Sequence, residues 1–211
     1  MSHTYEYARP SLTVDVVLFR WHAGWLEILL IERAHDPFAG RLALPGGFVD
    51  AGETPADAAR RELMEETGVP IEALVACGTF GDPGRDPRGW VVSAAYLGFA
   101  PPNTQAIAGS DARKVGWYRV GAITEMAFDH AQILATAMER LREMTQTGTL
   151  PLQLLPPGFR TRQARFLYSQ IWGESLPPQR FKAWLRRRDV VERVGPAKFA
   201  RRPGLRADWC R

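Results

Sequence analysis

Three glutamates in the first third of the chain have the spacing of a metal-binding helix face. Glu62, Glu65 and Glu66 lie at positions i, i+3 and i+4, so a helix would carry their carboxylates on one face. Like charges this close destabilise an isolated helix by roughly a few tenths of a kcal/mol per pair, so a cation is expected beside them. Carboxylates suit Mg²⁺, which takes its other ligands from water and substrate phosphates. The spacing allows a metal site for a diphosphate, but on these three residues alone a solvated acidic helix face is the favoured interpretation.

The residues around these glutamates form a longer pattern. From Gly47 to Val69 the chain reads GFVDAGETPADAARRELMEETGV. This segment matches G-x5-E-x7-R-E-U-x-E-E-x-G-U, where U is aliphatic, at all nine defined positions. The pattern is the Nudix box, so the chain resembles the Nudix hydrolases. The resemblance implies a pyrophosphatase that uses Mg²⁺, or Mn²⁺ in its place, to cleave a nucleoside diphosphate linked to another group.

The same resemblance assigns a role to each residue of the box. The three glutamates would bind the metal, helped by the backbone carbonyl of Gly47. Arg61 would orient Glu53 or Glu62 through a charge-assisted hydrogen bond, and it is also an i,i+4 partner of Glu65. Either Glu62 or Glu66 would help to deprotonate the attacking water, with Glu53 in a supporting role. The implied metal ligands are Gly47, Glu62, Glu65 and Glu66, and the implied catalytic residues are Arg61, Glu62, Glu66 and Glu53.

Two segments outside the box resemble the branch of the family that acts on ADP-ribose and NAD-related compounds. Before the box, Arg41 is a candidate phosphate ligand, whereas Phe38 is expected to pack rather than to stack on a base. After it, the loop GDPGRDPRGW at 81–90 carries two arginines that could clamp phosphates and aspartates that could hold ribose hydroxyls. A plain surface turn is the alternative for this loop. The candidate substrate-binding residues are Arg41, Asp82, Arg85, Asp86 and Arg88; Asp111 is a further acid near the expected site, or a turn residue.

The hydrophobic pattern predicts an α/β or α+β sandwich, which the family resemblance makes a Nudix α/β/α sandwich with a mixed sheet. Thr54 is the expected N-cap and Pro55 the first residue of a helix that ends near Thr67, with Gly68 as its stop. A second helix is predicted over 129–144. The predicted strands are 12–19, 26–31, 42–44, 74–80, 90–99 and 115–120, with a hairpin turn at 22–24 and a stop at the Pro-Gly-Gly of 45–47.

The distribution of charge divides the chain into two predicted domains. Residues 1–150 hold 13 Lys and Arg against 19 Asp and Glu, a net charge of −6, whereas residues 151–211 hold 14 against 4, a net charge of +10. The proline-rich segment 150–158 has the composition of a linker. We therefore expect a Nudix domain over 1–150 and a small basic domain over 151–211, whose partner would be a polyanion unless the charge is simply solvated.

The basic part of the chain has the element order of a winged helix-turn-helix. Helices are expected over 162–172 and 179–188, followed by a strand over 190–194 and an arginine-rich finger over 197–206. This order resembles the C-terminal domain of Nudix-related transcriptional regulators of NAD metabolism, although the box here is intact and the wing follows theirs only roughly. A packing or dimerisation element is the alternative. The residues expected to contact double-stranded DNA are Arg180, Lys182, Arg186, Arg187 and Arg188.

Composition sets the remaining expectations. No run approaches the roughly 18 apolar residues of a spanning helix, and the N-terminus lacks the pattern of a signal peptide. The two cysteines, Cys77 and Cys210, do not indicate a disulfide framework, so a cytoplasmic protein is expected. Related hydrolases and regulators make a homodimer the expected assembly. Two functions remain open: a Mg²⁺-dependent pyrophosphatase for ADP-ribose or a related compound, and a DNA-binding regulator that senses ADP-ribose.

Overall fold

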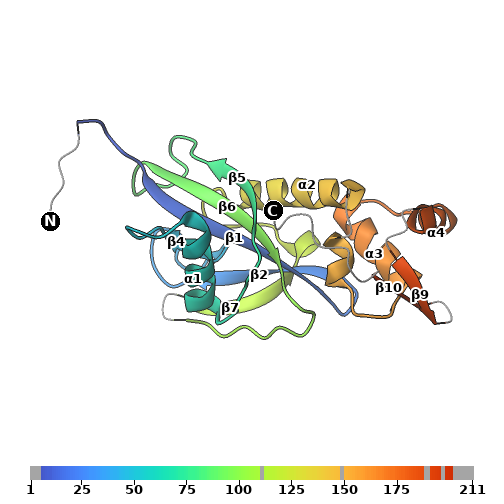
Figure 1. Ribbon diagram of the computed structural model, residues 1–211. Helices are drawn as coiled ribbons and strands as arrows, with labels where there is room; N and C mark the ends of the chain where they lie inside the picture. Colours follow the sequence, from blue (N-terminus) through green and yellow to red (C-terminus); the bar gives the residue numbers. More distant parts are fainter. Residues whose placement is uncertain (1–5, 110–111, 148–149, 188–190, 196–197, 202–211) are drawn as a thin grey trace.

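The computed structural model describes residues 6–109, 112–147, 150–187, 191–195 and 198–201. It contains a mixed sheet flanked by helices and, at the other end of the molecule, a small helical unit with its own three-stranded sheet (Figure 1). The first part comprises β1 (Ser11–His22), β2 (Trp25–Arg33), β3 (Leu42–Ala43), β4 (Gly46–Phe48), α1 (Pro55–Thr67), β5 (Val75–Phe80), β6 (Val91–Phe99), β7 (Ala112–Arg119), the 3₁₀ turn η1 (Val120–Ala122) and α2 (His130–Thr147).

The strands pair in the order β3-β2-β1-β6-β5, with β4 also on β1 and β7 on β2. Strand β1 runs parallel to β6 and antiparallel to β2, so the sheet is mixed. Both faces of β1 are apolar because helices cover both sides. Val14, Val16 and Leu18 lie in one core cluster with α1, whereas Val17 and Phe19 lie in another with α2. The predicted α/β/α sandwich with a mixed sheet is confirmed.

Helix α1 begins and ends at the predicted residues. The Thr54 hydroxyl accepts a hydrogen bond from the Asp57 backbone N–H, as an N-cap does, and Pro55 opens the helix. Gly68 closes it in the left-handed conformation, with φ of 66°, and its N–H donates to the Met64 carbonyl. The predicted hairpin is also present, because β1 and β2 pair across the two-residue turn at 23–24, where both residues have positive φ.

Strand β4 was not predicted, because the Pro-Gly-Gly segment was interpreted as a strand terminator. It pairs antiparallel with β1, placing Gly46 opposite Asp15 and Gly47 opposite Val14. A Cβ atom on Gly46 would lie 2.0 Å from the Val14 carbonyl oxygen, so only glycine permits this approach. The two glycines therefore allow a close approach of the two backbones, and the chain continues as a strand paired with β1.

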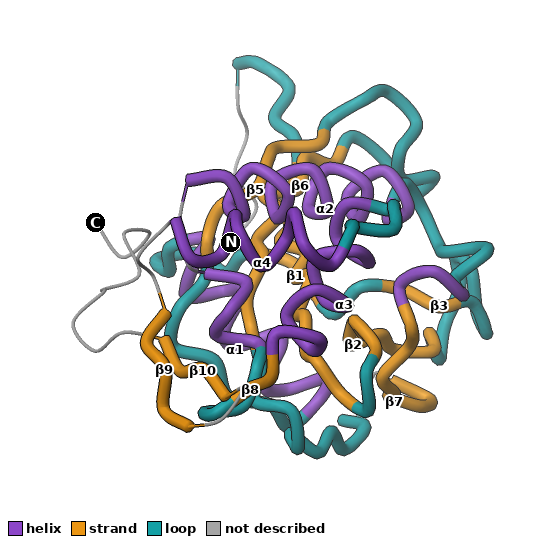
Figure 2. The backbone as a smooth tube through the Cα atoms, turned by 90° about the vertical axis from the view of Figure 1, so that its right-hand side faces the viewer, coloured by secondary structure: helices purple, strands orange, loops and turns teal. Residues whose placement is uncertain are grey.

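The second part follows the predicted order of a winged helix-turn-helix. It comprises η2 (Leu150–Leu154), β8 (Phe159–Arg160), α3 (Thr161–Trp172), α4 (Pro178–Arg187), β9 (Val191–Gly195) and β10 (Lys198–Arg201). The three strands form an antiparallel sheet in the order β8-β10-β9 beside the two helices (Figure 2). The short strand β8 was not predicted. Of the predicted finger only β10 is described, and Arg188 and Cys210 lie outside the described residues.

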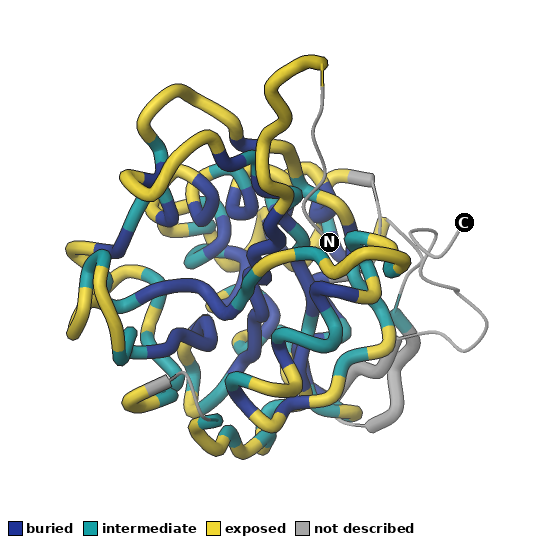
Figure 3. The backbone as a smooth tube through the Cα atoms, turned by 90° about the vertical axis from the view of Figure 1, so that its left-hand side faces the viewer, coloured by how far each residue is buried: buried dark blue, intermediate teal, exposed yellow. Residues whose placement is uncertain are grey.

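The segment 150–158 is not an exposed linker. Leu152, Leu154 and Leu155 are buried and belong to one apolar cluster that continues from the sheet through α2 to Tyr168 of α3. Figure 3 shows the buried residues gathered in the middle of the molecule, with exposed residues mostly on the outer loops. Apolar side chains thus join the two parts, and the division of the chain at residue 150 stays a prediction about domains.

A side-chain amide also joins the two parts. The Gln170 side chain in α3 accepts a hydrogen bond from the Leu26 N–H at 2.8 Å and donates one to the Gly24 carbonyl at 2.9 Å. Gly24 lies in the turn between β1 and β2, and Leu26 is the second residue of β2. The C-terminal unit therefore attaches to the tip of the central hairpin.

No helix in the described part of the chain is long and apolar enough to span a bilayer.

Cys77 on β5 is a free thiol, and burial raises its pKa to about 11. It is therefore a protonated, unreactive side chain near neutral pH.

The shared core predicts that the two parts unfold together. Leu154→Ala removes a side chain that is 1% exposed, and we expect a loss of about 2–5 kcal/mol in the free energy of unfolding. Urea titrations followed by tryptophan fluorescence and circular dichroism should give one coincident transition. The control Phe166→Ala, at a side chain that is 48% exposed, should cost less than about 1 kcal/mol. Two separate transitions in the wild type would contradict a common core.

Candidate active site

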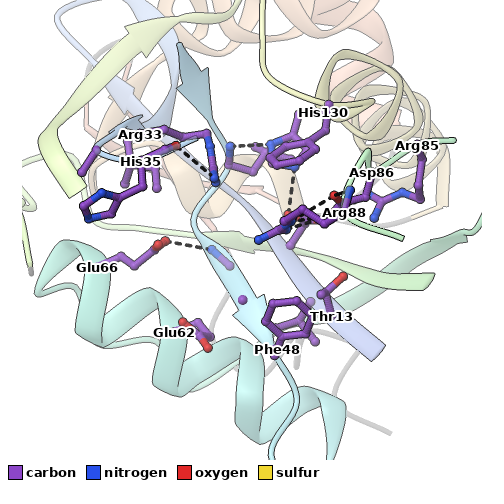
Figure 4. A pocket seen from close by; sticks show the side chains of 18 of the residues that line it. Thr13, Arg33, His35, Phe48, Glu62, Glu66, Arg85, Asp86, Arg88 and His130 are labelled. Carbon is purple, nitrogen blue, oxygen red and sulfur yellow. Dashed lines mark hydrogen bonds and ion pairs between the residues drawn. The ribbon is translucent and has the colours of Figure 1, made fainter. Parts of the chain in front are cut away.

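A pocket of about 360 Å³ opens where β1, β4, α1 and the loop 81–89 meet (Figure 4). Glu62 and Glu66 project into it from α1, and Asp86 and Arg88 lie on the opposite side. Its walls carry six carboxylates and three guanidinium groups, a formal charge of −3 with the histidines neutral. The charged residues are Asp15, Asp36, Asp50, Glu62, Glu66, Asp86, Arg33, Arg85 and Arg88.

Backbone contacts with β4 hold the two pocket glutamates. Glu66 accepts a hydrogen bond from the Gly46 N–H at 2.9 Å. The Glu62 carboxylate lies so close to Gly47 that a Cβ atom there would come within 2.4 Å of it. Burial raises the pKa of Glu62, against the opposing effect of the neighbouring Arg61 guanidinium. A buried carboxylate of this kind is stabilised by a cation beside it.

Arg61 gathers the other acids of the motif outside the pocket. Its guanidinium contacts Glu53 at 2.6 Å, Glu62 at 2.9 Å and Glu65 at 3.2 Å. The hydrogen bonds to Glu53 raise the pKa of Arg61 and lower that of Glu53. Glu65 is 59% exposed and does not line the pocket. The orienting contacts predicted for Arg61 are therefore present to both Glu53 and Glu62.

The donor set suits a hard divalent cation. Among the described residues no three His, Cys, Asp or Glu side chains converge as a ready metal cluster. The pocket nevertheless holds two carboxylates 4 residues apart on one helix, beside the backbone of Gly47. Mg²⁺ binds to proteins through one or two carboxylates and leaves its other positions to water and phosphate. The candidate ligands are thus Glu62, Glu66 and Gly47, whereas the predicted ligand Glu65 lies outside the pocket and pairs with Arg61.

The loop 81–89 is fixed by its own ion pairs. Arg85 is buried and donates to Asp129 at 2.6 and 2.8 Å, while Asp86 binds the Arg88 guanidinium at 2.7 Å. Of the two arginines in the loop, only Arg88 lines the pocket with a side chain that is about half exposed. Arg85 and Asp86 therefore line the pocket as positioning groups, and Asp82 does not line it.

The segment before the box contributes a different arginine from the predicted one. Arg41 lies outside the pocket and pairs with Glu125 at 3.2 Å. Arg33, at the end of β2, lines the pocket, with its guanidinium 4.8 Å from the Phe128 ring centroid. Burial lowers the pKa of Arg33, and the nearby Arg88 adds to this effect. Phe38 packs edge-on against Phe128 at 4.8 Å, the packing role expected for it.

A buried polar network under the pocket was missed. The Leu44 N–H donates to His130 Nδ1 at 2.9 Å, so the ring proton is on Nε2, which lies 3.2 Å from an Asp15 oxygen. Asp15 also accepts a hydrogen bond from Ser93 and lies 3.6 Å from Arg85. The sequence held one signal of this network, because Asp15 is a charged residue inside an apolar strand. The predicted Asp111 lies outside the described residues.

Comparison with protein-family models decides the family. The model of the NUDIX domain matches residues 9–140, which contain the pocket and every residue of the box. The chain belongs to the Nudix family. The remaining residues contribute the elements from η2 to β10, which lie outside the Nudix match.

Two of the relatives extend the likeness to more than nine tenths of the chain. An ADPR responsive transcriptional repressor NtrR of Acinetobacter baylyi is 35% identical over 201 residues, 92% of this chain and 80% of the relative. An ADP-ribose pyrophosphatase of Methanocaldococcus jannaschii is 36% identical over 132 residues, 63% of this chain and 75% of the relative. The crystal structure of Shewanella oneidensis NrtR complexed with a 27mer DNA has a TM-score of 0.72 and 28% identity, covering 91% of this chain and 94% of that one.

The buried histidine of this Nudix domain predicts a pH dependence of stability. Histidine titrates near 6.5 in an unfolded chain, whereas burial lowers the pKa of His130. Below about pH 6.5 the unfolded state therefore binds a proton that the folded state does not, and the free energy of unfolding falls as the pH is lowered. One proton contributes at most about 1.4 kcal/mol per pH unit.

Urea unfolding of the wild type and His130→Gln at pH 7.5 and 5.5 measures this contribution. The variant is expected to be less stable at pH 7.5, because it disturbs the bonds to Leu44 and Asp15, but to lose less stability on acidification. Equal losses in both proteins would show that His130 does not titrate in this way.

Proposed function

We propose that the chain is a metal-dependent Nudix pyrophosphatase that hydrolyses ADP-ribose or a related nucleoside diphosphate derivative. The observation that carries this proposal is the pocket itself, in which Glu62 and Glu66 face the guanidinium groups of Arg33 and Arg88. Carboxylates bind hard cations and guanidinium groups bind phosphate oxygens, so this combination supports a metal-bound diphosphate. The pyrophosphatase and the ADPR-responsive repressor among the relatives support ADP-ribose as the ligand.

The charge of the pocket makes hydrolysis without a metal unfavourable. A diphosphate would enter walls that already carry a formal charge of −3. A bound divalent cation, for which we propose Mg²⁺ with Mn²⁺ as a substitute, neutralises the substrate and lowers the pKa of a bound water. Glu62 and Glu66 would hold it beside Gly47, and either carboxylate is placed to accept a proton from the water.

The remaining residues would orient the substrate. Arg88 lies 5.4 Å from the Phe48 ring and 5.5 Å from the Phe128 ring, so a cation and two aromatic faces border one side of the pocket. These groups suit a phosphate attached to a planar base. In ADP-ribose, water would add to one phosphorus and the bridging P–O bond would break, giving AMP and ribose 5-phosphate.

Glu66→Gln tests the catalytic proposal. The substitution removes a negative charge from the pocket but keeps the shape of the side chain, so we expect kcat for AMP release from ADP-ribose with Mg²⁺ to fall by at least about 100-fold. Glu72→Gln, an exposed position outside the pocket, is the matched control and should behave as the wild type. If the wild type turned over none of a panel of nucleoside diphosphate derivatives, the proposed pyrophosphatase activity would be refuted.

A second function is proposed for the C-terminal unit, namely ADP-ribose-sensitive binding of double-stranded DNA. Helix α4 buries Phe181 and Leu185 and leaves a basic face exposed. The exposed basic residues are Arg180, Lys182, Arg186 and Arg187. The likeness to a repressor and to a DNA-bound regulator supports this proposal, and binding to an operator of two half-sites would require a homodimer.

Arg187→Ala tests the DNA proposal. We expect weaker binding to a palindromic operator from the chain's own promoter region, with the slope of log K against log salt reduced by about 0.9 for one lost phosphate contact. Fluorescence anisotropy at several salt concentrations measures both, with and without ADP-ribose. Arg113→Ala, on the Nudix part, is the control. Equal affinity of the wild type for this operator and for random duplex DNA would exclude specific regulation.

A further inference from the structure

An irregular segment between β6 and β7 contacts the last turn of the helix that carries the glutamates. The Gly109 N–H donates to the Glu66 carbonyl at 3.0 Å, and the Ile107 N–H donates to the Thr67 carbonyl at 2.9 Å. The segment passes beside α1 in Figure 1. The last carbonyls of a helix have no partner within the helix, so the segment supplies hydrogen bonds that α1 cannot make for itself.

Gly109 sets how closely the segment approaches. A Cβ atom at this position would lie 1.8 Å from the Glu65 carbonyl oxygen and 3.1 Å from Glu66 Cα. These are backbone atoms, which cannot rotate away as a flexible side chain can. Gly109 does not have a positive φ, so glycine is required here for space rather than for its conformational freedom.

The middle of the segment is anchored to the sheet. The Thr104 carbonyl accepts hydrogen bonds from Arg20 Nη1 at 2.9 Å and from Trp117 Nε1 at 3.1 Å. Arg20 is itself buried, pairs with Glu27 at 2.8 Å and stacks 4.2 Å from the Trp117 ring centroid. Strands β1, β2 and β7 therefore determine where the segment meets α1.

We infer that residues 101–109 form a strut that positions the metal-binding glutamates, and that Gly109 is the positioning residue where the strut meets the helix. Glu66 is held from two sides, because its carboxylate accepts the Gly46 N–H and its carbonyl accepts the Gly109 N–H. The inference rests on the proposed function, since it takes Glu62 and Glu66 as metal ligands. It extends the site to residues outside the Nudix box, which act through backbone contacts.

Gly109→Ala tests the strut directly. To relieve the 1.8 Å contact, either the segment or the Glu65–Glu66 backbone must move, so we expect Mn²⁺ affinity to fall about tenfold, as for other groups that orient metal ligands. Mn²⁺ titrations followed by the electron paramagnetic resonance signal of free Mn²⁺ measure this without turnover. Gly121→Ala is the matched control, because nothing lies within 4 Å of a Cβ atom there.

Activity assays separate positioning from general damage. Raising the Mn²⁺ concentration should restore much of the kcat of Gly109→Ala, whereas a loss of folded protein would not be rescued in this way. Trp117→Phe, which removes one donor to Thr104 and keeps an aromatic ring, should weaken Mn²⁺ binding in the same direction by about threefold. It serves as the test if Gly109→Ala does not fold.

The outcomes separate the strut from the proposed function. Wild-type Mn²⁺ affinity in Gly109→Ala, or in Trp117→Phe if only that variant folds, would overturn the strut and leave the enzyme proposal standing. A wild type that binds no Mn²⁺ would overturn both.

Discussion

Repulsion among the carboxylates on one face of α1 is the constraint around which the site is built. Arg61 contacts three of the acids, of which Glu53 and Glu65 lie outside the pocket. Glu66 is held separately by the Gly46 backbone. The folded chain thus balances part of the negative charge with its own groups and leaves the pocket face acidic. Such a face attracts a cation, and a bound cation would in turn reduce the repulsion of an anionic ligand.

Close approach of backbone segments places the groups that balance the charge of these carboxylates. Gly46 and Gly47 bring β4 against β1 on one side and against the Glu62 carboxylate on the other. Side chains at these positions would separate the helix from the sheet and the carboxylates from the backbone N–H groups. The first glycine of the Nudix box is therefore as much a packing residue as a candidate metal ligand.

Local signals in the sequence predicted α1, because its first proline lies in the helix and its N-cap and terminal glycine lie directly beside it. The chemistry of the box was predicted from its resemblance to the Nudix pattern. Strand β4 could not be predicted, because its partner lies about 30 residues away and only the close approach of the two backbones explains the glycines. His130 and Arg33 were missed for the same reason, since they reach the pocket only when segments far apart in the chain assemble.

The loop 81–89 shows the limit of predicting roles from residue types. Its two arginines were expected to act alike, yet Arg85 is buried against Asp129 whereas Arg88 remains at the pocket. Spacing alone does not distinguish a charge that is paired inside the fold from one left accessible to a ligand. The difference arises from the position of α2, because the residue directly before this helix, Asp129, is the partner of Arg85.

The contacts of the Gln170 amide connect the two parts of the chain and limit which changes the β1–β2 hairpin can accept. The amide pairs with the N–H of Leu26 and the carbonyl of Gly24, so the contact depends on backbone groups and on the positive-φ turn rather than on the chemistry of a particular side chain. The length of the turn cannot vary, because one inserted residue would move one of the two backbone groups out of reach. Among homologues, the length of this hairpin should therefore be conserved more strictly than its sequence.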